Sequence, residues 1–444
     1  MPTVVAGYDT GDPPAGTVPP VKPRSDIDAS LDVVLLQRIT LRTLMAGLIP
    51  AGAAMSGAYA ASAVLGEDLT GSAFLGGLVA ASMTTGSALA SLPLARLMAA
   101  RGRRPGLLVG YLTGILGALL AVSAALTGWY VLLVFGMLGI GAGHGANLAA
   151  RFAAADLAPA EGRARAIGTL VWASTVGSVV GPTIGFGPAK DLAGSIGFPP
   201  LAGPYVVAAF LFAVAALVIH RRLRPDPLVV AGGVGLGGSD GAGLAAAARS
   251  LVASPVGRLA VVSMVVGQVV MVAVMTMTPL HMRDGDHALE IIGYVISLHI
   301  IGMYACAPVV GWLADRVGVR PLLAAGGVLL VVGAELTART DAADSLGIFV
   351  GLFLIGLGWS VGLISASAML TSEFDGPERV RVQGLSDLCM TATGGLAGVG
   401  SGVVVALGSY EILGHASAVI GVVPAAAVLL MVLSARKSAA ARRS

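Results

Sequence analysis

The run from Leu346 to Leu370, LGIFVGLFLIGLGWSVGLISASAML, contains no charged residue. A helix of about 20 predominantly apolar residues crosses the hydrocarbon core of a bilayer, so this run is long enough to span a membrane. The whole chain agrees with it, because 56% of its 444 residues are hydrophobic and 11% are charged, whereas a soluble domain carries about 25% charged residues. The mean hydropathy is +0.88. The sequence therefore predicts an integral membrane protein.

Eleven more apolar segments of similar length lie on either side of this run. The chain contains 63 glycines, and small residues are typical of helices that pack closely in lipid. We therefore predict an all-α membrane protein with twelve transmembrane helices, at about 41–64, 72–98, 105–126, 130–150, 167–187, 204–220, 258–280, 291–313, 321–338, 346–370, 384–408 and 414–434.

The positions of the basic residues predict how these helices are oriented. With both termini in the cytoplasm, Lys190, Arg283 and Arg339 fall outside, and the other twenty-four of the 27 Lys and Arg residues fall inside, as the positive-inside rule requires. This distribution explains the net charge of +3 without a nucleic-acid partner. Residues 1–32 lack the basic start and apolar core of a cleaved signal peptide. We expect a multi-pass protein of the cytoplasmic (inner) membrane with both termini cytoplasmic.

Two motifs occur twice at one spacing and divide the chain into halves. Arg101-Gly-Arg-Arg-Pro105 recurs as Val317-Gly-Val-Arg-Pro321, and Arg163-x-Arg-x-x-Gly168 recurs as Arg379-x-Arg-x-x-Gly384, each 216 residues later. This shift contains an even number of helices, so the copies have parallel topology, as in transporters whose halves are related by an axis along the membrane normal. We predict two pseudo-symmetric six-helix bundles at 37–220 and 257–435, a flexible cytoplasmic linker at 221–256, a disordered cytoplasmic tail at 1–36 and a basic cytoplasmic tail at 436–444.

The segment GWLADRVGVRP at 311–321 resembles the cytoplasmic loop signature G-x-L-A-D-R-x-G-R-R of the major facilitator superfamily. The resemblance spans the whole chain and implies the major facilitator fold, with a gate at this loop. By pseudo-symmetry, we predict that Asp315 meets the positive N-terminal end of the helix at 167–187 across the interface between the halves. The gating candidates in this loop are Gly311, Asp315, Arg316, Gly318 and Arg320.

The first half carries a degenerate copy of the same loop at 95–104. It keeps Gly102, Arg103 and Arg104, which are gating candidates, but Ala99 stands where the family has an aspartate. The carboxylate-dependent gate is therefore predicted at the second copy.

The predicted helix at 167–187 contains Gly177, Gly181, Pro182 and Gly185 in the pattern G-x-x-x-G-P-x-x-G. This pattern is similar to a motif associated with drug/proton antiporters of the superfamily. Small residues and one proline also allow close helix contact and a kink. We predict a helix-packing role for these four residues, and the motif alone does not establish efflux.

A narrower resemblance concerns the predicted helices at 258–280 and 291–313. Met271-x-x-x-Met275 and His299-x-x-x-Met303 are similar to the paired motifs of CcoA-type copper importers, whose wider family also includes riboflavin carriers. An i, i+4 pair lies on one helical face, and soft sulfur ligands select Cu(I). Cys306 extends the second stripe. The four motif residues are predicted metal-binding residues for Cu(I) as substrate, and Cys306 is a further substrate-binding candidate.

Methionine also fills gaps in apolar cores, so the same residues could line an apolar cavity for an organic solute. The 216-residue shift places Met55 at the position of Met271 and Met83 at the position of His299. These two methionines are added to the substrate-binding candidates.

The predicted helix at 130–150 carries His144 and Asn147 in an apolar setting, with Arg151 near its cytoplasmic end. Polar groups at membrane depth usually face a cavity or a partner. We predict His144 and Asn147 as substrate-binding residues and His144 and Asp387 as proton-relay candidates, with interhelical hydrogen bonding or helix capping as their alternative roles. Arg151 is predicted to be an interface anchor.

These features predict a secondary transporter that moves a small solute by alternating access. The specific hypothesis is copper(I) uptake; the alternative is a proton-coupled organic-solute carrier for drug efflux or riboflavin-like uptake. A transporter-like sensor would need a partner to signal through, and the cytoplasmic loops are short. An enzyme is not predicted, because convergent carboxylates, a nucleophile triad, zinc spacing and a phosphate loop are missing from the sequence. We expect no cofactor, a small-molecule or metal-ion substrate, the lipid bilayer as surroundings and a monomer.

Overall fold

The computed structural model describes residues 24–235 and 240–441. Within these ranges, twelve helices are long and apolar enough to cross a membrane, which confirms the all-α membrane fold with twelve spans. Most of the predicted N-terminal tail, residues 1–23, lies outside the described residues, as do 236–239 of the predicted linker and 442–444 of the predicted basic tail.

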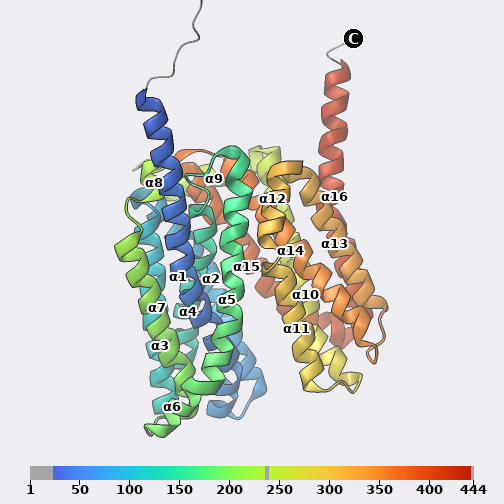
Figure 1. Cartoon of the computed structure of the whole chain (residues 1–444). Helices are drawn as coiled ribbons and strands as arrows, with labels where there is room; N and C mark the ends of the chain where they lie inside the picture. Colours follow the sequence, from blue (N-terminus) through green and yellow to red (C-terminus); the bar gives the residue numbers. More distant parts are fainter. Residues whose placement is uncertain (1–23, 236–239, 442–444) are drawn as a thin grey trace, which may run out of the picture.

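The first six spans form one bundle (Figure 1). Short helical segments connect the last two of them, and the first of these segments contains Pro188 and the non-helical Gly187. The helices are α1 (Arg24–Thr70), α2 (Ala73–Arg101), α3 (Arg103–Thr127), α4 (Tyr130–Ala153), α5 (Arg163–Ile184) and α7 (Gly203–Arg222), with η1 (Ala160–Gly162), η2 (Gly185–Ala189), α6 (Lys190–Ser195) and η3 (Pro200–Ala202) between them.

The last six spans form the second bundle beside the first (Figure 1). Each bundle has its own buried apolar core. The helices are α10 (Pro255–Asp284), α11 (Leu289–Tyr304) continued by α12 (Ala307–Val317), α13 (Val319–Arg339), α14 (Ser345–Glu373), α15 (Gly376–Leu407) and α16 (Tyr410–Ala441). The bundles are joined by a connection that contains α8 (Pro227–Val230) and α9 (Asp240–Ala253).

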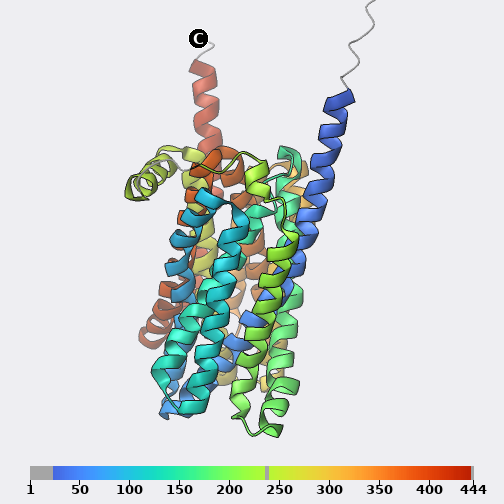
Figure 2. The same cartoon turned by 90° about the vertical axis from the view of Figure 1, so that its left-hand side faces the viewer.

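The beginning of α1, the end of α16 and the connecting helices α8 and α9 lie at one end of the molecule, as Figures 1 and 2 both show. We call this end the terminal face and the opposite end the far face. Helix α1 begins at Arg24 and α16 continues to Ala441, so both helices extend into the ranges where the sequence predicts tails.

One predicted span is interrupted in the structure. The segment expected as a continuous helix at 291–313 breaks between Tyr304 and Ala307. Pro308 follows the break, and a proline has no N–H to donate to the carbonyl four residues earlier. That carbonyl belongs to Tyr304, the last residue of α11, so the proline explains where the helix ends.

The glycine pattern of α5 packs this helix against α1. A methyl group on Gly177 would lie 2.9 Å from the Gly52 Cα, and one on Gly57 would lie 2.8 Å from the Gly181 carbonyl oxygen. Neither methyl group fits without backbone movement. Gly185 leaves ordinary contact distance to Pro204. The contacts agree with a packing role for this motif.

Candidate solute site and gate

A cavity of about 60 Å³ lies between the two bundles. Its walls come from α1, α4 and α5 of the first half and from α11 and α14 of the second. Eight of its lining side chains are polar, are aromatic or carry a thioether, and can therefore recognise a solute: Met55, His144, Asn147, Arg151, Ser174, Ser178, Tyr304 and Trp359. The lining therefore includes three of the predicted substrate-binding residues, Met55, His144 and Asn147.

Three polar residues of α4 share the face that lines the cavity, because they are separated by three and four residues. Asn147 accepts a hydrogen bond from the Tyr111 hydroxyl at 3.0 Å through its Oδ1 atom. This bond directs the amide group and leaves its N–H groups for other partners. Within the described chain, the buried Nδ1 atom of His144 has no hydrogen-bond partner. Arg151 completes this face.

An aromatic pair from the second half forms the opposite wall. The Tyr304 and Trp359 rings meet edge to face, with centroids 5.8 Å apart and an interplanar angle of 85°. Trp359 also donates from Nε1 to Gln268 Oε1 at 2.8 Å, which fixes the plane of the indole. Sequence patterns missed both residues, because an aromatic residue in an apolar helix carries no sign of the face it occupies.

The Arg151 side chain is buried between the two halves, whereas an interface anchor would expose its charged group, so that prediction was wrong. Its guanidinium pairs with the carboxylate of Asp387 on α15, donates to Ser367 Oγ at 3.0 Å and to the Leu148 carbonyl at 2.6 Å. The two charged side chains are 3% and 5% exposed. A buried arginine is retained only with a charged or polar partner, and here that partner comes from the other half.

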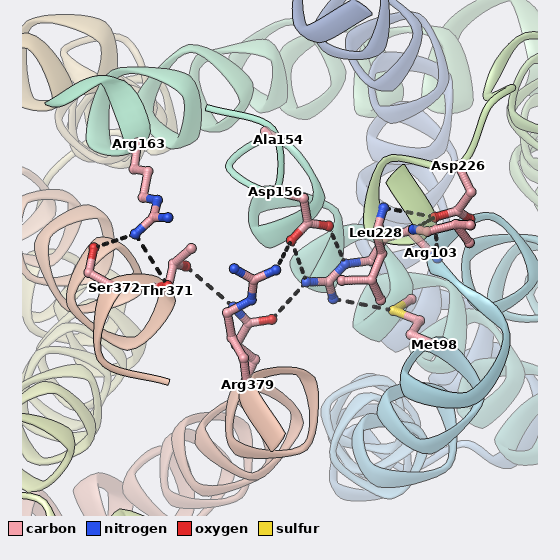
Figure 3. Close-up of polar contacts among 12 residues, drawn as sticks. Met98, Arg103, Ala154, Asp156, Arg163, Asp226, Leu228, Thr371, Ser372 and Arg379 are labelled. Carbon is pink, nitrogen blue, oxygen red and sulfur yellow. Dashed lines mark hydrogen bonds and ion pairs between the residues drawn. The ribbon is translucent and has the colours of Figure 1, made fainter. Parts of the chain in front are cut away.

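A second charged cluster also joins the two halves, and Figure 3 shows it around Asp156, Arg103 and Arg379. Arg103 donates to both carboxylate oxygens of Asp156 at 2.8 and 3.1 Å and to Gln383 Oε1 at 2.8 Å. Arg379 also donates to Asp156, at 3.3 Å. Asp156 therefore forms ion pairs with one arginine from each half. The sequence indicated Arg103 as a gating candidate but missed its partners Asp156 and Gln383, and it missed Arg379 as the second arginine that binds Asp156.

Asp315 makes the contact that the repeat predicts. Its carboxylate accepts from the backbone N–H groups of Ala164 and Arg165 at 3.1 and 3.0 Å, at the first turn of α5. A methyl group on Gly311 would lie 2.5 Å from the Ala164 carbonyl oxygen, so only glycine allows this approach. The predicted contact between Asp315 and this helix is confirmed.

The neighbouring loop residues have different surroundings. Gly318 has φ +101, a left-handed conformation that favours glycine. Arg320 lines the same surface pocket as Asp315, whereas the Arg316 guanidinium lies 5.2 Å from the centre of the Trp312 ring. Arg320 is therefore near the Asp315 contact, and Arg316 is turned toward an aromatic ring.

In the first half, a carboxylate from the connection between the bundles binds the N-terminus of α3, beside the degenerate loop. Asp226, which precedes α8, accepts from the backbone N–H groups of Arg103 and Arg104 at 3.1 and 2.7 Å and from that of Leu228 at 2.9 Å. Gly235 N–H donates to the Ala99 carbonyl at 3.1 Å. The connection is thus tied to the degenerate loop.

Two other gating candidates of this loop have local roles. Gly102 has φ +96 between α2 and α3. The Arg104 side chain donates to the His220 carbonyl on α7 at 3.1 Å, so it remains within its own half. Of the three first-half candidates, Arg103 is the residue whose side chain reaches the other half.

The proposed copper ligands lie within the second bundle, outside the cavity lining. His299 is completely buried, with Nδ1 2.7 Å from the Leu352 carbonyl oxygen of α14. Met271 and Met303 are buried in the same apolar core, and Met275 packs against it partly exposed. Cys306 is a partly exposed free thiol at the break after α11.

Met83 is buried in the core of the first bundle. Of the predicted sulfur residues, Met55 alone is part of the described cavity lining.

Comparison with known proteins agrees with this architecture. The family model of the Major Facilitator Superfamily matches residues 43–289 and again 286–444, so the chain belongs to this superfamily of membrane transporters. The uncharacterized MFS-type transporter YddS of Bacillus subtilis is 35% identical over 390 residues, which cover 87% of this chain and 89% of YddS. The chain is a major facilitator secondary transporter of a small solute.

Two further likenesses are more distant. The riboflavin transporter RfnT of Brucella anthropi is 28% identical over 314 residues, covering 69% of this chain and 74% of RfnT. The crystal structure of the human organic anion transporter MFSD10 matches with a TM-score of 0.73 at 15% identity, covering 88% of this chain and 99% of that chain. The structural match supports the fold.

Proposed function

We propose that this transporter moves an organic solute with a planar, polar ring system by alternating access. The observation that carries the proposal is the lining of the central cavity, where Trp359 and Tyr304 face the hydrogen-bonding side chains His144 and Asn147. Aromatic walls with a few placed polar groups are typical of sites for small organic molecules. The likeness to a riboflavin transporter is consistent with a heteroaromatic solute.

The size of the cavity requires movement during transport. A pocket for an organic ligand typically encloses about 300–1,000 Å³, whereas the cavity measures about 60 Å³. Binding therefore separates the surrounding helices of the two halves. Alternating access supplies this movement, because each half moves as a bundle around the central site.

We place the terminal face in the cytoplasm, in the cytoplasmic membrane, because the positive-inside rule favours that orientation. The charged contacts described above then close the cytoplasmic side. In this proposal, the contact of Asp315 with the first turn of α5 and the cluster of Arg103, Asp156 and Gln383 form the gate. Solute release to the cytoplasm requires these contacts to break.

Copper(I) is the second candidate, and one observation favours it. The thioether of Met55 and the imidazole of His144 both line the cavity, and soft ligands of this kind suit Cu(I). The site for copper would then differ from the one that the sequence motif predicts, because Met275 and His299 are not part of the lining.

Uptake into vesicles that contain the purified protein distinguishes the two candidates. We expect riboflavin to accumulate above the level of empty vesicles, and radioactive copper under reducing conditions to remain at that level. Trp359→Phe keeps a ring in place but removes the N–H that bonds Gln268, and it should reduce riboflavin uptake several-fold. Met55→Leu should leave riboflavin uptake near the parental rate.

Met275→Leu is the matched control, because it removes a sulfur atom outside the cavity lining and conserves volume. It should leave uptake of both probes unchanged. Copper accumulation that is lost in Met55→Leu and in His144→Gln, at normal protein abundance, would replace the organic-solute proposal by copper transport.

A further inference from the structure

We propose that Arg151 binds a negatively charged group of the solute, a carboxylate or a phosphate, and that Asp387 occupies this position while the carrier is empty. The inference rests on the proposed function and adds the charge class of the organic solute. An arriving anion would take the place of Asp387 on the guanidinium. The exchange would release α15 from α4 and thereby couple solute binding to the gate.

The charge of the cavity is the first argument. Arg151 is the one charged residue in the described cavity lining. The other polar groups on the same face of α4 are the Asn147 amide, whose oxygen is already bonded to Tyr111, and His144, whose Nδ1 is buried without a partner. These three side chains share one helical face and converge on the lining. The lining therefore combines one positive charge with groups that can donate hydrogen bonds.

The geometry of the ion pair is the second argument. Asp387 meets two nitrogens of the guanidinium, Nη1 and Nη2. A solute carboxylate or phosphate presents the same pair of oxygens, and guanidinium groups bind both in this two-bond arrangement. An exchange of one anion for another leaves the buried arginine paired. It avoids the large penalty of an isolated buried charge.

The displaced carboxylate of Asp387 has another basic residue beside it. Asp387 and Arg103 line the same small cavity of about 10 Å³, together with Gln383. Arg103 forms the bond to Gln383 that crosses between the halves. A carboxylate that turns toward Arg103 competes with Gln383 for this guanidinium. Anion binding at Arg151 would thus weaken two contacts of α15 with the first half, one directly and one through Arg103.

Riboflavin and flavin mononucleotide test this inference, because they share a ring system and differ by a phosphate. Quenching of flavin fluorescence by the purified full-length carrier reports binding of both. We expect flavin mononucleotide to bind about tenfold more tightly than riboflavin, since a charge-assisted pair is involved. In Arg151→Gln/Asp387→Asn, which removes both buried charges, this preference should disappear while riboflavin binding persists. Arg339→Gln, outside the described cavity lining, should preserve the preference.

Asp387→Asn gives the most specific test. If Asp387 competes with the solute, this variant should bind flavin mononucleotide several-fold more tightly than the parent. A purely structural ion pair predicts the opposite, because its loss would disturb the site. Tighter binding in this variant therefore separates competition from structural support.

A second readout does not depend on the choice of solute. Spin labels at Trp129→Cys and Leu346→Cys, both exposed near the starts of α4 and α14, report the distance across the far face. The background replaces Cys306 and Cys389 by serine. Asp387→Asn without solute should shift the distance distribution toward shorter values, because the loosened terminal face opens as the far face closes.

Equal binding of the two flavins by the parent, or weaker binding of flavin mononucleotide by Asp387→Asn, would overturn the inference and leave the organic-solute proposal intact. An unchanged distance distribution in Asp387→Asn would overturn the proposed link to the gate. Copper accumulation with no binding of either flavin would refute the proposed function itself, and the inference with it.

Discussion

Asp315→Asn is the sharpest test of the gate, because it replaces one oxygen of a carboxylate that joins the two halves. The carboxylate accepts two backbone N–H groups at the first turn of α5, at 3.1 and 3.0 Å. An asparagine retains one acceptor oxygen but places an NH₂ group against the second N–H. It also removes the negative charge from the positive end of a helix.

The size of the effect follows from these two losses. A hydrogen bond to a charged group contributes about 1.5–3 kcal/mol, and a negative charge at a helix N-terminus contributes about 0.3–1 kcal/mol. One of the two bonds and the charge are lost together, so we expect the state closed at the terminal face to lose about 2–4 kcal/mol. This corresponds to a change of about 30- to 1,000-fold in the ratio of the two states.

The spin labels at positions 129 and 346 measure this ratio directly. Asp315→Asn should increase the population with the shorter far-face distance, without solute. Asp375→Asn is the matched control, because it removes an aspartate charge at the same face from a residue that has no side-chain capping bond. Identical distance distributions in Asp315→Asn and the parent would refute the assignment of Asp315 to the gate.

The remaining predictions concern stability and packing. Asp226→Asn should lower the free energy of unfolding by about 1–3 kcal/mol, because the carboxylate satisfies the N–H groups of Arg103 and Arg104; an unchanged thermal transition in detergent would contradict this role. Arg103→Ala should cost about 3–5 kcal/mol because it leaves Asp156 buried with one of its two cations removed, and normal abundance in the membrane would argue against it. Gly181→Val should prevent close packing of α5 on α1, since even a methyl group would meet the Gly57 N–H at 2.8 Å; a variant with parental transport and thermal stability would show that the packing is dispensable.

The spans and their duplication were accessible from the sequence because they depend on local properties. Crossing a bilayer requires a continuous apolar helix, and the run at 346–370 meets that requirement wherever it lies in the protein. The repeat then related Asp315 to α5 by symmetry, and the structure contains that contact. Pro308 ends α11 for an equally local reason, although its effect within the span was not predicted.

The role of Arg151 could not be read from the sequence, because its partner Asp387 lies 236 residues away. The position of Arg151 near the end of a helix favoured a surface anchor. In the structure, α15 packs closely against α2 at Gly384 and Ala95, and the Arg151–Asp387 pair is buried. The degenerate loop of the first half shows the same limit. Ala99 indicated a lost carboxylate, but the sequence did not show that Asp226 of the connection between the bundles would bind the N-terminus of α3 beside this loop.

The predicted copper ligands show that the sequence does not reveal which helical faces line a cavity. The spacing places Met271 with Met275, and His299 with Met303, on shared helical faces. In a membrane helix, however, apolar residues lie on all sides. The pattern therefore does not show whether such a face lines a cavity or packs against a neighbouring helix. In the structure, His299 Nδ1 lies within hydrogen-bond distance of the Leu352 carbonyl.

The sequence by itself determined that this is a membrane protein with twelve spans in two halves, because these features follow from apolar length, charge distribution and repetition. Only the tertiary structure decided which polar and aromatic side chains meet between the halves, because that depends on contacts between residues far apart in the chain.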